Sequence, residues 1–169
     1  MTLVVARSNW RDEYEDLFRR EGIRLWRVLY GVAGGRRDIA DEAVAEAFAR
    51  AMERSDSISD PLAWIYRTAL RFARGELKRE GRLRQGDEDV PDSGRVAEFG
   101  PDTVGELTSA LASLSPQQRT AVILHYSEDL PADDVARLMG ISSATVRVHL
   151  HRGRKRLRQL LGAEEERND

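Results

Sequence analysis

The sequence predicts an all-α protein built from two small helical bundles joined by a flexible linker, the second containing a helix-turn-helix. Apolar residues recur at three- and four-residue steps through most of the chain, as on one face of an α-helix. This periodicity is lost between residues 81 and 105, where glycine, proline and acidic residues are frequent. We therefore expect a domain over 10–80, an acidic linker over 81–105, a domain over 106–162 and a disordered tail over 163–169.

Two helices are predicted at the start of the first domain. The first runs from Glu13 to Val32, and the pair Gly34–Gly35 ends it. Its apolar stripe consists of Tyr14, Leu17, Phe18, Leu25, Trp26, Leu29 and Tyr30. The second runs from Asp38 to Arg54, and its acidic residues gather on the side opposite the expected core. The predicted buried side consists of Ala40, Val44, Phe48, Ala51 and Met52.

A third helix is predicted from Leu62 to about Gly81, after the turn-rich loop Ser55–Asp60 and a proline suited to a first helical turn. Its inward positions are Leu62, Ile65, Ala69, Phe72 and Ala73. Outside that stripe lie Trp64, Tyr66, Arg67, Arg71, Arg74, Lys78 and Arg79. Mixed rings and cations suit single-stranded nucleic acid, since bases stack on rings and cations follow phosphates. The alternative is a tryptophan in the domain core with arginines in solvent.

The second domain is predicted to begin with a helix near Thr103, whose inward residues are Val104, Leu107, Leu111 and Leu114. Ser115-Pro116-Gln117-Gln118 is a capping box with proline at the first helical position. It starts a helix that continues through His125 and supports the elements that follow.

The stretch from Leu130 to Leu161 has the pattern of a helix-turn-helix. Gly140 suits the left-handed residue that ends a helix, and Ser142 suits the cap of the next. In the second helix the inward stripe consists of Val146, Leu150, Gly153, Leu157 and Leu160. Arg137 to Leu161 contains seven arginine or lysine residues and no acidic residue. A bare basic helix after such a turn fits a DNA major groove, although a basic helical face is more often simply solvated.

Composition excludes several classes of function. The net charge of −2 is not that of a polycation that coats nucleic acid. The chain has no cysteine, and His125, His149 and His151 lack the spacing of a ligand set. No apolar run approaches the ~18 residues of a membrane span, and the start of the chain lacks the pattern of a signal peptide. We therefore expect a cytoplasmic protein with no metal, no cofactor and no membrane insertion.

These elements, in this order, resemble the small two-domain sigma factors of bacterial RNA polymerase, the extracytoplasmic-function group of the sigma-70 family. The likeness covers about residues 12–80 and 106–161. Residues 40–48 (ADEAVAEAF) look like the acidic helix, typically AEDLVQEVF, that docks on the polymerase β′ clamp helices. Residues 60–67 (DPLAWIYR) look like the segment that melts and holds the promoter minus-10 element. Residues 114–119 (LSPQQR) and 140–158 look like the domain that reads the minus-35 element.

The resemblance implies partners and residue roles. The partners are core RNA polymerase, through its β′ clamp helices and β flap, and promoter DNA, often with an anti-sigma factor that wraps both domains. Polymerase docking is implied for Asp38, Asp41, Glu42, Glu46 and Arg50. Contact with the melted minus-10 strand is implied for Asp56, Ser57, Trp64, Arg67, Arg71, Arg74 and Lys78. Contact with the minus-35 element is implied for Thr145, Arg147, Val148, His151, Arg152, Arg154, Lys155 and Arg158.

The chain departs from the family pattern at four positions. Ala43 and Ala45 replace the usual leucine and glutamine of the docking helix, which removes apolar area and a polar contact. Arg71 stands where asparagine is common, and Gly75 stands where aspartate is frequent.

Two other classes of function compete with the sigma-factor interpretation. A helix-turn-helix regulator that acts without polymerase would leave the acidic face of the second helix without a role. A nuclease would need carboxylates that converge on Mg²⁺, whereas Asp38, Asp41, Glu42 and Glu46 are spread along one helix face. We therefore expect a protein that is not an enzyme.

Overall fold

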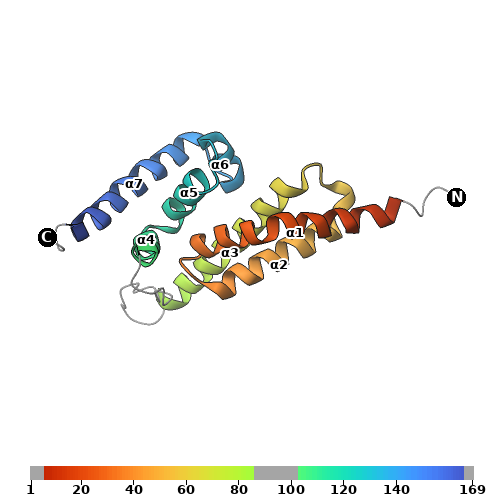
Figure 1. Cartoon of the computed structure of the whole chain (residues 1–169), viewed down its shortest axis with the longest axis horizontal. Helices are drawn as coiled ribbons and strands as arrows, with labels where there is room; N and C mark the ends of the chain where they lie inside the picture. Colours follow the sequence, from red (N-terminus) through yellow and green to blue (C-terminus); the bar gives the residue numbers. More distant parts are fainter. Residues whose placement is uncertain (1–5, 86–102, 166–169) are drawn as a thin grey trace.

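The computed structural model describes residues 6–85 and 103–165, in which every regular element is helical (Figure 1). The elements are α1 (Ala6–Val32), α2 (Arg37–Glu53), the 3-10 turn η1 (Ser55–Ser57), α3 (Pro61–Gln85), α4 (Thr103–Ala112), α5 (Pro116–Tyr126), α6 (Ala132–Met139) and α7 (Ser143–Glu165). The all-α prediction is confirmed. None of these helices combines the length and apolar character needed to cross a membrane.

The first bundle consists of α1, α2 and α3, which lie side by side along most of their length (Figure 1). Leu25 and Leu29 of α1 are fully buried with Ile65 and Leu70 of α3. The seven buried residues of α2 are Ile39, Ala40, Ala43, Val44, Ala47, Phe48 and Ala51. Four of these are alanines, so α2 can approach its neighbours closely.

Two residues predicted to face this core are exposed. Phe18 of α1 is 52% exposed and Met52 of α2 is 40% exposed. Both lie at the edge of the α1–α2 contact, where the ring of Phe18 meets the ring of Phe48 edge-on at 5.0 Å. The apolar stripe predicted the correct face of each helix, but the neighbouring helices do not cover the whole width of that face.

The second bundle consists of α4 to α7, with α5 at its centre. All residues from Arg119 to Leu124 are buried. Helix α7 crosses α5 at Gly153, where an added Cβ would lie 2.8 Å from Cγ2 of Val122. Leu107 was predicted to face inward and is 46% exposed, because this segment is packed mainly through Ala110 of α4 and through Leu114, which follows α4.

The predicted helix ends follow local rules that the structure confirms. Gly34 and Gly35 have φ angles of 65° and 86°, and Gly140 has a φ of 68°, so each is left-handed where its helix ends. The Ser115 hydroxyl accepts a hydrogen bond from the Gln118 N–H at 3.3 Å. The Ser142 hydroxyl accepts one from the Thr145 N–H at 3.1 Å.

The helices are longer than predicted at three ends. Helix α1 begins at Ala6, and α3 continues through residues 81–85, which were expected to belong to the linker. Helix α7 continues to Glu165, beyond the predicted start of the tail. Arg36, at the turn before α2, donates to both carboxylate oxygens of Glu80 at 2.6 and 2.9 Å, which fixes the distal half of α3. Helix α4 begins at Thr103, within the predicted linker, and residues 86–102 and 166–169 lie outside the described residues.

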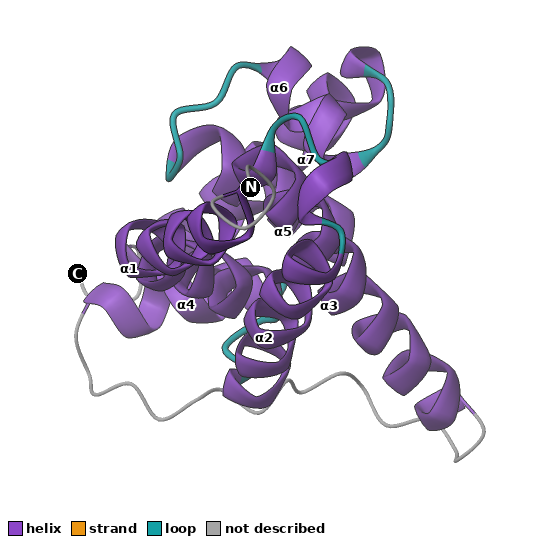
Figure 2. Ribbon diagram, turned by 90° about the vertical axis from the view of Figure 1, so that its right-hand side faces the viewer, coloured by secondary structure: helices purple, strands orange, loops and turns teal. Residues whose placement is uncertain are grey.

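The two bundles contact one another through α1 with α5 and through α3 with α6 (Figure 2). Their buried apolar residues form one continuous cluster that includes Val32 of the first bundle and Ile123 of the second. The two predicted bundles are present, and they are packed together.

Candidate nucleic-acid interface

The outer face of α7 presents the residues predicted to read duplex DNA. Thr145, Arg147, Val148, His151, Arg152, Arg154, Lys155 and Arg158 are all exposed. The inner stripe is buried at Val146, Leu150 and Gly153, which fixes the rotation of the helix. Val148 is 45% exposed, so an apolar side chain stands among cations where a thymine methyl could contact it.

One acidic side chain approaches this face. The guanidinium of Arg147 lies 3.7 Å from a carboxylate oxygen of Asp133, which belongs to the first turn of α6. Both side chains are about two-thirds exposed, so the pair restrains Arg147 only weakly and leaves it available to a base.

His149, which no prediction assigned a role, is half-buried on the side of α7. Its Nδ1 is buried and has no hydrogen-bond partner among the described residues. Burial lowers the pKa of His149, and the positive charge of Arg152 lowers it further. Both effects favour the neutral form of the His149 imidazole beside the basic face.

The outer face of α3 presents most of the residues predicted to hold a single strand. Arg67, Arg71 and Lys78 are exposed, and Trp64 is half-buried with its ring against the core. Asp56 and Ser57 are exposed on η1, where the Ser57 hydroxyl donates to the Arg54 carbonyl at 2.9 Å. The Asp60 carboxylate accepts the Ala63 N–H at 3.1 Å and so caps the start of α3.

Two α3 residues differ from the prediction for this face. Tyr66 was placed outside the apolar stripe, yet it is 7% exposed. Burial raises the pKa of Tyr66 to about 12, and the carboxylate of Glu128 acts in the same direction. Arg74 is half-buried and donates to the Met139 carbonyl at 3.0 Å. Burial lowers the pKa of Arg74, with a further contribution from Arg71.

The acidic face of α2 consists of Asp38, Asp41, Glu42 and Glu46. The first three are exposed and Glu46 is partly exposed. Asp38 accepts hydrogen bonds from Arg36, which lower its pKa. Glu46 pairs with Arg50, also predicted for this face, at 2.6 Å. No group of carboxylates or histidines in residues 6–85 and 103–165 is arranged to hold a metal ion.

Asp41 has a second role that sequence reasoning missed. Its carboxylate accepts a hydrogen bond from the indole N–H of Trp26 at 2.7 Å. The Trp26 ring stacks on Tyr30 at 5.0 Å, and the guanidinium of Arg37 lies 5.8 Å from the Trp26 ring. Asp41 thus joins α1 to α2 as well as contributing to the acidic face.

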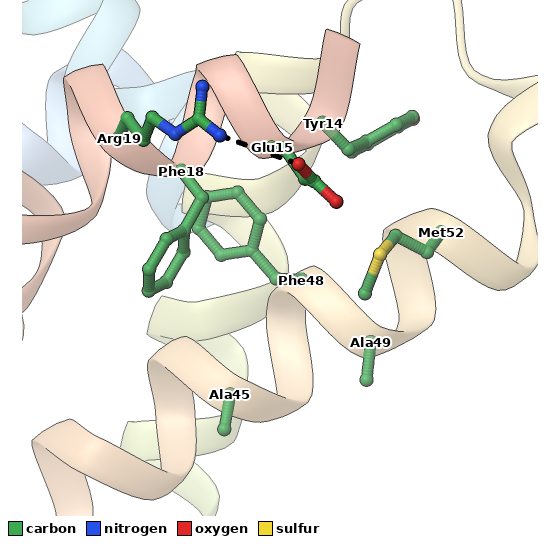
Figure 3. Close-up of a pocket in the computed structure, with 8 residues that line it drawn as sticks. All are labelled: Tyr14, Glu15, Phe18, Arg19, Ala45, Phe48, Ala49 and Met52. Carbon is green, nitrogen blue, oxygen red and sulfur yellow. Dashed lines mark ion pairs between the residues drawn. The ribbon is translucent and has the colours of Figure 1, made fainter. Parts of the chain in front are cut away.

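An apolar pocket adjoins this face between α1 and α2 (Figure 3). It has a volume of about 310 Å³, and its apolar lining consists of Tyr14, Phe18, Ala45, Phe48, Ala49 and Met52. Glu15 and Arg19 pair at 3.5 Å on its rim. The sequence carried one signal of the pocket: Ala45 and Ala49 are small residues one helical turn apart, so they leave space beside larger apolar groups.

Comparisons with known proteins agree with this geometry. The family "Sigma-70 region 2" matches residues 17–83, and "Sigma-70, region 4" matches residues 105–157. The chain is 31% identical over 154 residues to the RNA polymerase sigma-E factor of Streptomyces antibioticus, covering 88% of this chain and 84% of that protein. It is 29% identical to CarQ of Myxococcus xanthus, covering 92% and 93%. It is also 29% identical to ECF sigma factor SigE of Mycolicibacterium smegmatis, covering 88% of this chain and 61% of that protein.

Two solved structures share the fold. One is the sigma factor RpoE in complex with the anti-sigma factor NepR from Bartonella quintana, with a TM-score of 0.71 and 22% identity over 89% of this chain and 97% of that chain. The other is CnrH in complex with the cytosolic domain of CnrY, with a TM-score of 0.66 and 22% identity over 92% of each chain.

Proposed function

The chain belongs to the sigma-70 family, in its extracytoplasmic-function group, and from this membership we propose that it directs core RNA polymerase to specific promoters. The proposal rests on one coincidence. The two family matches fall on the two bundles, and each bundle exposes the charge that its role requires: acidic on α2, and basic on α3 and α7.

We propose that α2 and the adjoining pocket dock on the β′ clamp helices of the polymerase. Glu42 is an exposed carboxylate on α2, and the pocket beside it can receive an apolar side chain. Ala45 lines that pocket at the position where the family pattern described above has glutamine, so docking here depends more on apolar burial and less on a polar contact. The second bundle is proposed to contact the β flap.

The first bundle is proposed to hold the melted minus-10 strand along α3, with η1 beside the captured base. Arg67, Arg71 and Lys78 are free to follow phosphates, and Trp64 supplies a ring. The protein needs no catalytic group for this step, because binding energy can stabilise bases once they leave the stack.

The second bundle is proposed to read the minus-35 element with α7 in the major groove. We infer that Arg147 donates two hydrogen bonds to a guanine, whereas Arg154, Lys155 and Arg158, which are exposed farther along the helix, contact phosphates. The protein then acts at the DNA in the cytoplasm. The complex of RpoE with the anti-sigma factor NepR supports an anti-sigma factor as a further partner.

Run-off transcription on a selected promoter library tests the proposal. Core polymerase supplemented with this protein should start transcripts that core polymerase alone does not. A helix-turn-helix regulator that acts without docking would bind duplex DNA yet leave core polymerase unable to start, and that result would refute the proposal.

A further inference from the structure

Several glycines inside the helices are explained by a neighbouring side chain that needs the space. An added Cβ at Gly31 would lie 2.8 Å from Cδ1 of Ile123, and one at Gly153 would lie 2.8 Å from Cγ2 of Val122. At Gly22 an added Cβ would lie 3.4 Å from an aromatic ring of the same helix. At these positions the missing side chain serves packing within the protein.

Gly75, in the middle of α3, has no such neighbour. An added Cβ at Gly75 would meet nothing within 4 Å. The surroundings of Gly81 and Gly162 are equally open, but these two lie near the ends of α3 and α7. Gly140 is also open, and its φ of 68° explains why it is glycine. Glycine in a helix interior weakens the helix relative to alanine, so Gly75 weakens α3 without improving any contact among the described residues.

The helix on either side of Gly75 is held in place, so the glycine does not act as a hinge. Ala73 is fully buried, and Leu77 packs against the apolar core. Farther along α3, the carboxylate of Glu80 accepts hydrogen bonds from Arg36 at 2.6 and 2.9 Å. An advantage of the missing side chain then comes from a molecule that approaches α3 from outside.

The surroundings of Gly75 favour an anion. Arg71 and Lys78 lie one helical turn before and after Gly75 on the same face of α3, and both are exposed. Neither has a carboxylate partner within residues 6–85 and 103–165. Glu76, the acidic residue next to Gly75, pairs with Arg79, and the Glu76 side chain is only 18% exposed. The face around Gly75 is therefore basic, and no free carboxylate offsets its charge.

The sugar–phosphate backbone of a nucleic-acid strand fits this position. Without a Cβ at Gly75, a phosphate oxygen can approach the helix closely enough to contact the Cα–H group, while Arg71 and Lys78 reach the strand from either side. A larger side chain at Gly75 would hold the strand away from both cations. A helix of another protein could also approach a glycine closely, but it would bury Arg71 and Lys78 at a cost in desolvation.

We propose that the backbone of the melted strand crosses α3 directly over Gly75, between Arg71 and Lys78. The family pattern described above frequently has aspartate at this position, and its charge would repel a phosphate, so the close crossing is a property of this chain. The inference rests on the proposed role of α3. Because the contact is with the strand backbone and not with a base, a strand of any sequence can test it.

Binding of fluorescently labelled oligo(dT) to the full chain, measured by anisotropy, tests the inference. Gly75→Leu should lower the affinity by about fivefold or more, and the slope of log affinity against log salt concentration should fall by about 0.7 for each phosphate contact that is lost. The same substitution should raise the urea midpoint, because leucine favours a helix more than glycine does. Damage to the fold cannot explain a variant that is more stable and binds more weakly.

Gly81→Leu is the matched control on the same helix. An added Cβ at Gly81 also meets nothing within 4 Å, but Gly81 lies beyond Lys78 and not between the two cations. Gly81→Leu should leave the affinity for oligo(dT) unchanged. Equal binding by wild type and Gly75→Leu, including no binding by either, would overturn the inference, as would an equal loss in the two variants.

The outcomes also separate this inference from the proposed function, because oligo(dT) binding needs neither polymerase nor promoter. If the wild type starts transcripts and Gly75→Leu binds oligo(dT) normally, only the inference fails. If the wild type starts none and Gly75→Leu still binds oligo(dT) more weakly than Gly81→Leu, only the proposed function fails. Normal oligo(dT) binding by Gly75→Leu with a weaker pull-down of core polymerase would assign Gly75 to a protein contact and overturn its assignment to the strand.

Discussion

The crossing of α5 and α7 at Gly153 allows a quantitative test of how tightly α7 is held. An alanine at 153 would gain about 1 kcal/mol of helix propensity. Its Cβ would, however, lie 2.8 Å from Cγ2 of Val122, and overpacking of this kind costs about 1–3 kcal/mol. Val122 cannot easily rotate away, because a β-branched side chain in a helix has one strongly preferred χ1 rotamer. We therefore expect Gly153→Ala to lower the free energy of unfolding by about 1 kcal/mol.

The second half of the test removes the obstacle. Val122→Ala alone should cost about 2 kcal/mol, because the side chain is 6% exposed and leaves a cavity. In the double variant the new Cβ partly fills that cavity and the propensity gain is kept, so the total loss should be about 1 kcal/mol. The two substitutions should therefore couple by about 2 kcal/mol, measured by urea unfolding followed by circular dichroism.

Additivity would refute this reasoning. If the double variant loses the sum of the single losses to within about 0.5 kcal/mol, the two positions are not in the contact described. Gly162→Ala is the matched control on the same helix, since an added Cβ there meets nothing within 4 Å. It should leave stability unchanged or raise it.

Four further predictions concern single surfaces. Arg147→Ala should weaken DNA binding mainly through one promoter position, whereas Arg158→Ala should weaken binding to every sequence and reduce the slope of log affinity against log salt concentration by about 1. Binding titrations against point-substituted promoters distinguish the two variants, and an equal loss of affinity for all sequences would contradict the role of Arg147. Met52→Glu should weaken binding to core polymerase in a pull-down without lowering the urea midpoint, because Met52 is 40% exposed; unchanged binding would remove the pocket from the docking surface. Ser115→Ala should lower the free energy of unfolding by about 1 kcal/mol through loss of the α5 cap, and an unchanged urea midpoint would argue against that cap. The hydrogen bond from Arg36 lowers the pKa of Asp38 in the folded protein, so the Asp38 carboxylate stabilises the fold above its unfolded pKa and loses this effect as pH falls through its folded pKa. The difference in free energy of unfolding between wild type and Asp38→Asn should therefore disappear in acid. A difference that does not change with pH would contradict the ion pair.

Local chemistry in the sequence predicted much of the fold. Gly34–Gly35 and Gly140 end helices because left-handed backbone favours glycine, and Ser115 and Ser142 cap helices through hydrogen bonds three residues away. Such rules involve only neighbours along the chain, so they can be applied without knowing the tertiary structure. The rotation of α7 was likewise predicted from one apolar stripe.

Contacts between distant segments could not be predicted in this way. The carbonyl that accepts the hydrogen bond from Nε of Arg119 belongs to Val32, which lies 87 residues earlier in the chain. Nothing in the sequence near Arg119 indicates this partner. Tyr66 is buried because the second bundle and α1 approach α3 there, although the helical pattern of α3 alone placed it outside. The pocket lined by Phe18 and Met52 could not be predicted for the same reason. The spacing of apolar residues predicts which face of a helix is apolar, but it does not predict how much of that face the neighbouring helices cover.

The apolar lining between α1 and α2 has a consequence for the effect of salt. Attraction between the cations of α7 and DNA phosphates weakens steeply as the salt concentration rises. Burial of an apolar side chain against Phe18, Phe48 and Met52 does not depend on charge in this way. Association with the polymerase should therefore persist at salt concentrations at which the chain alone releases duplex DNA.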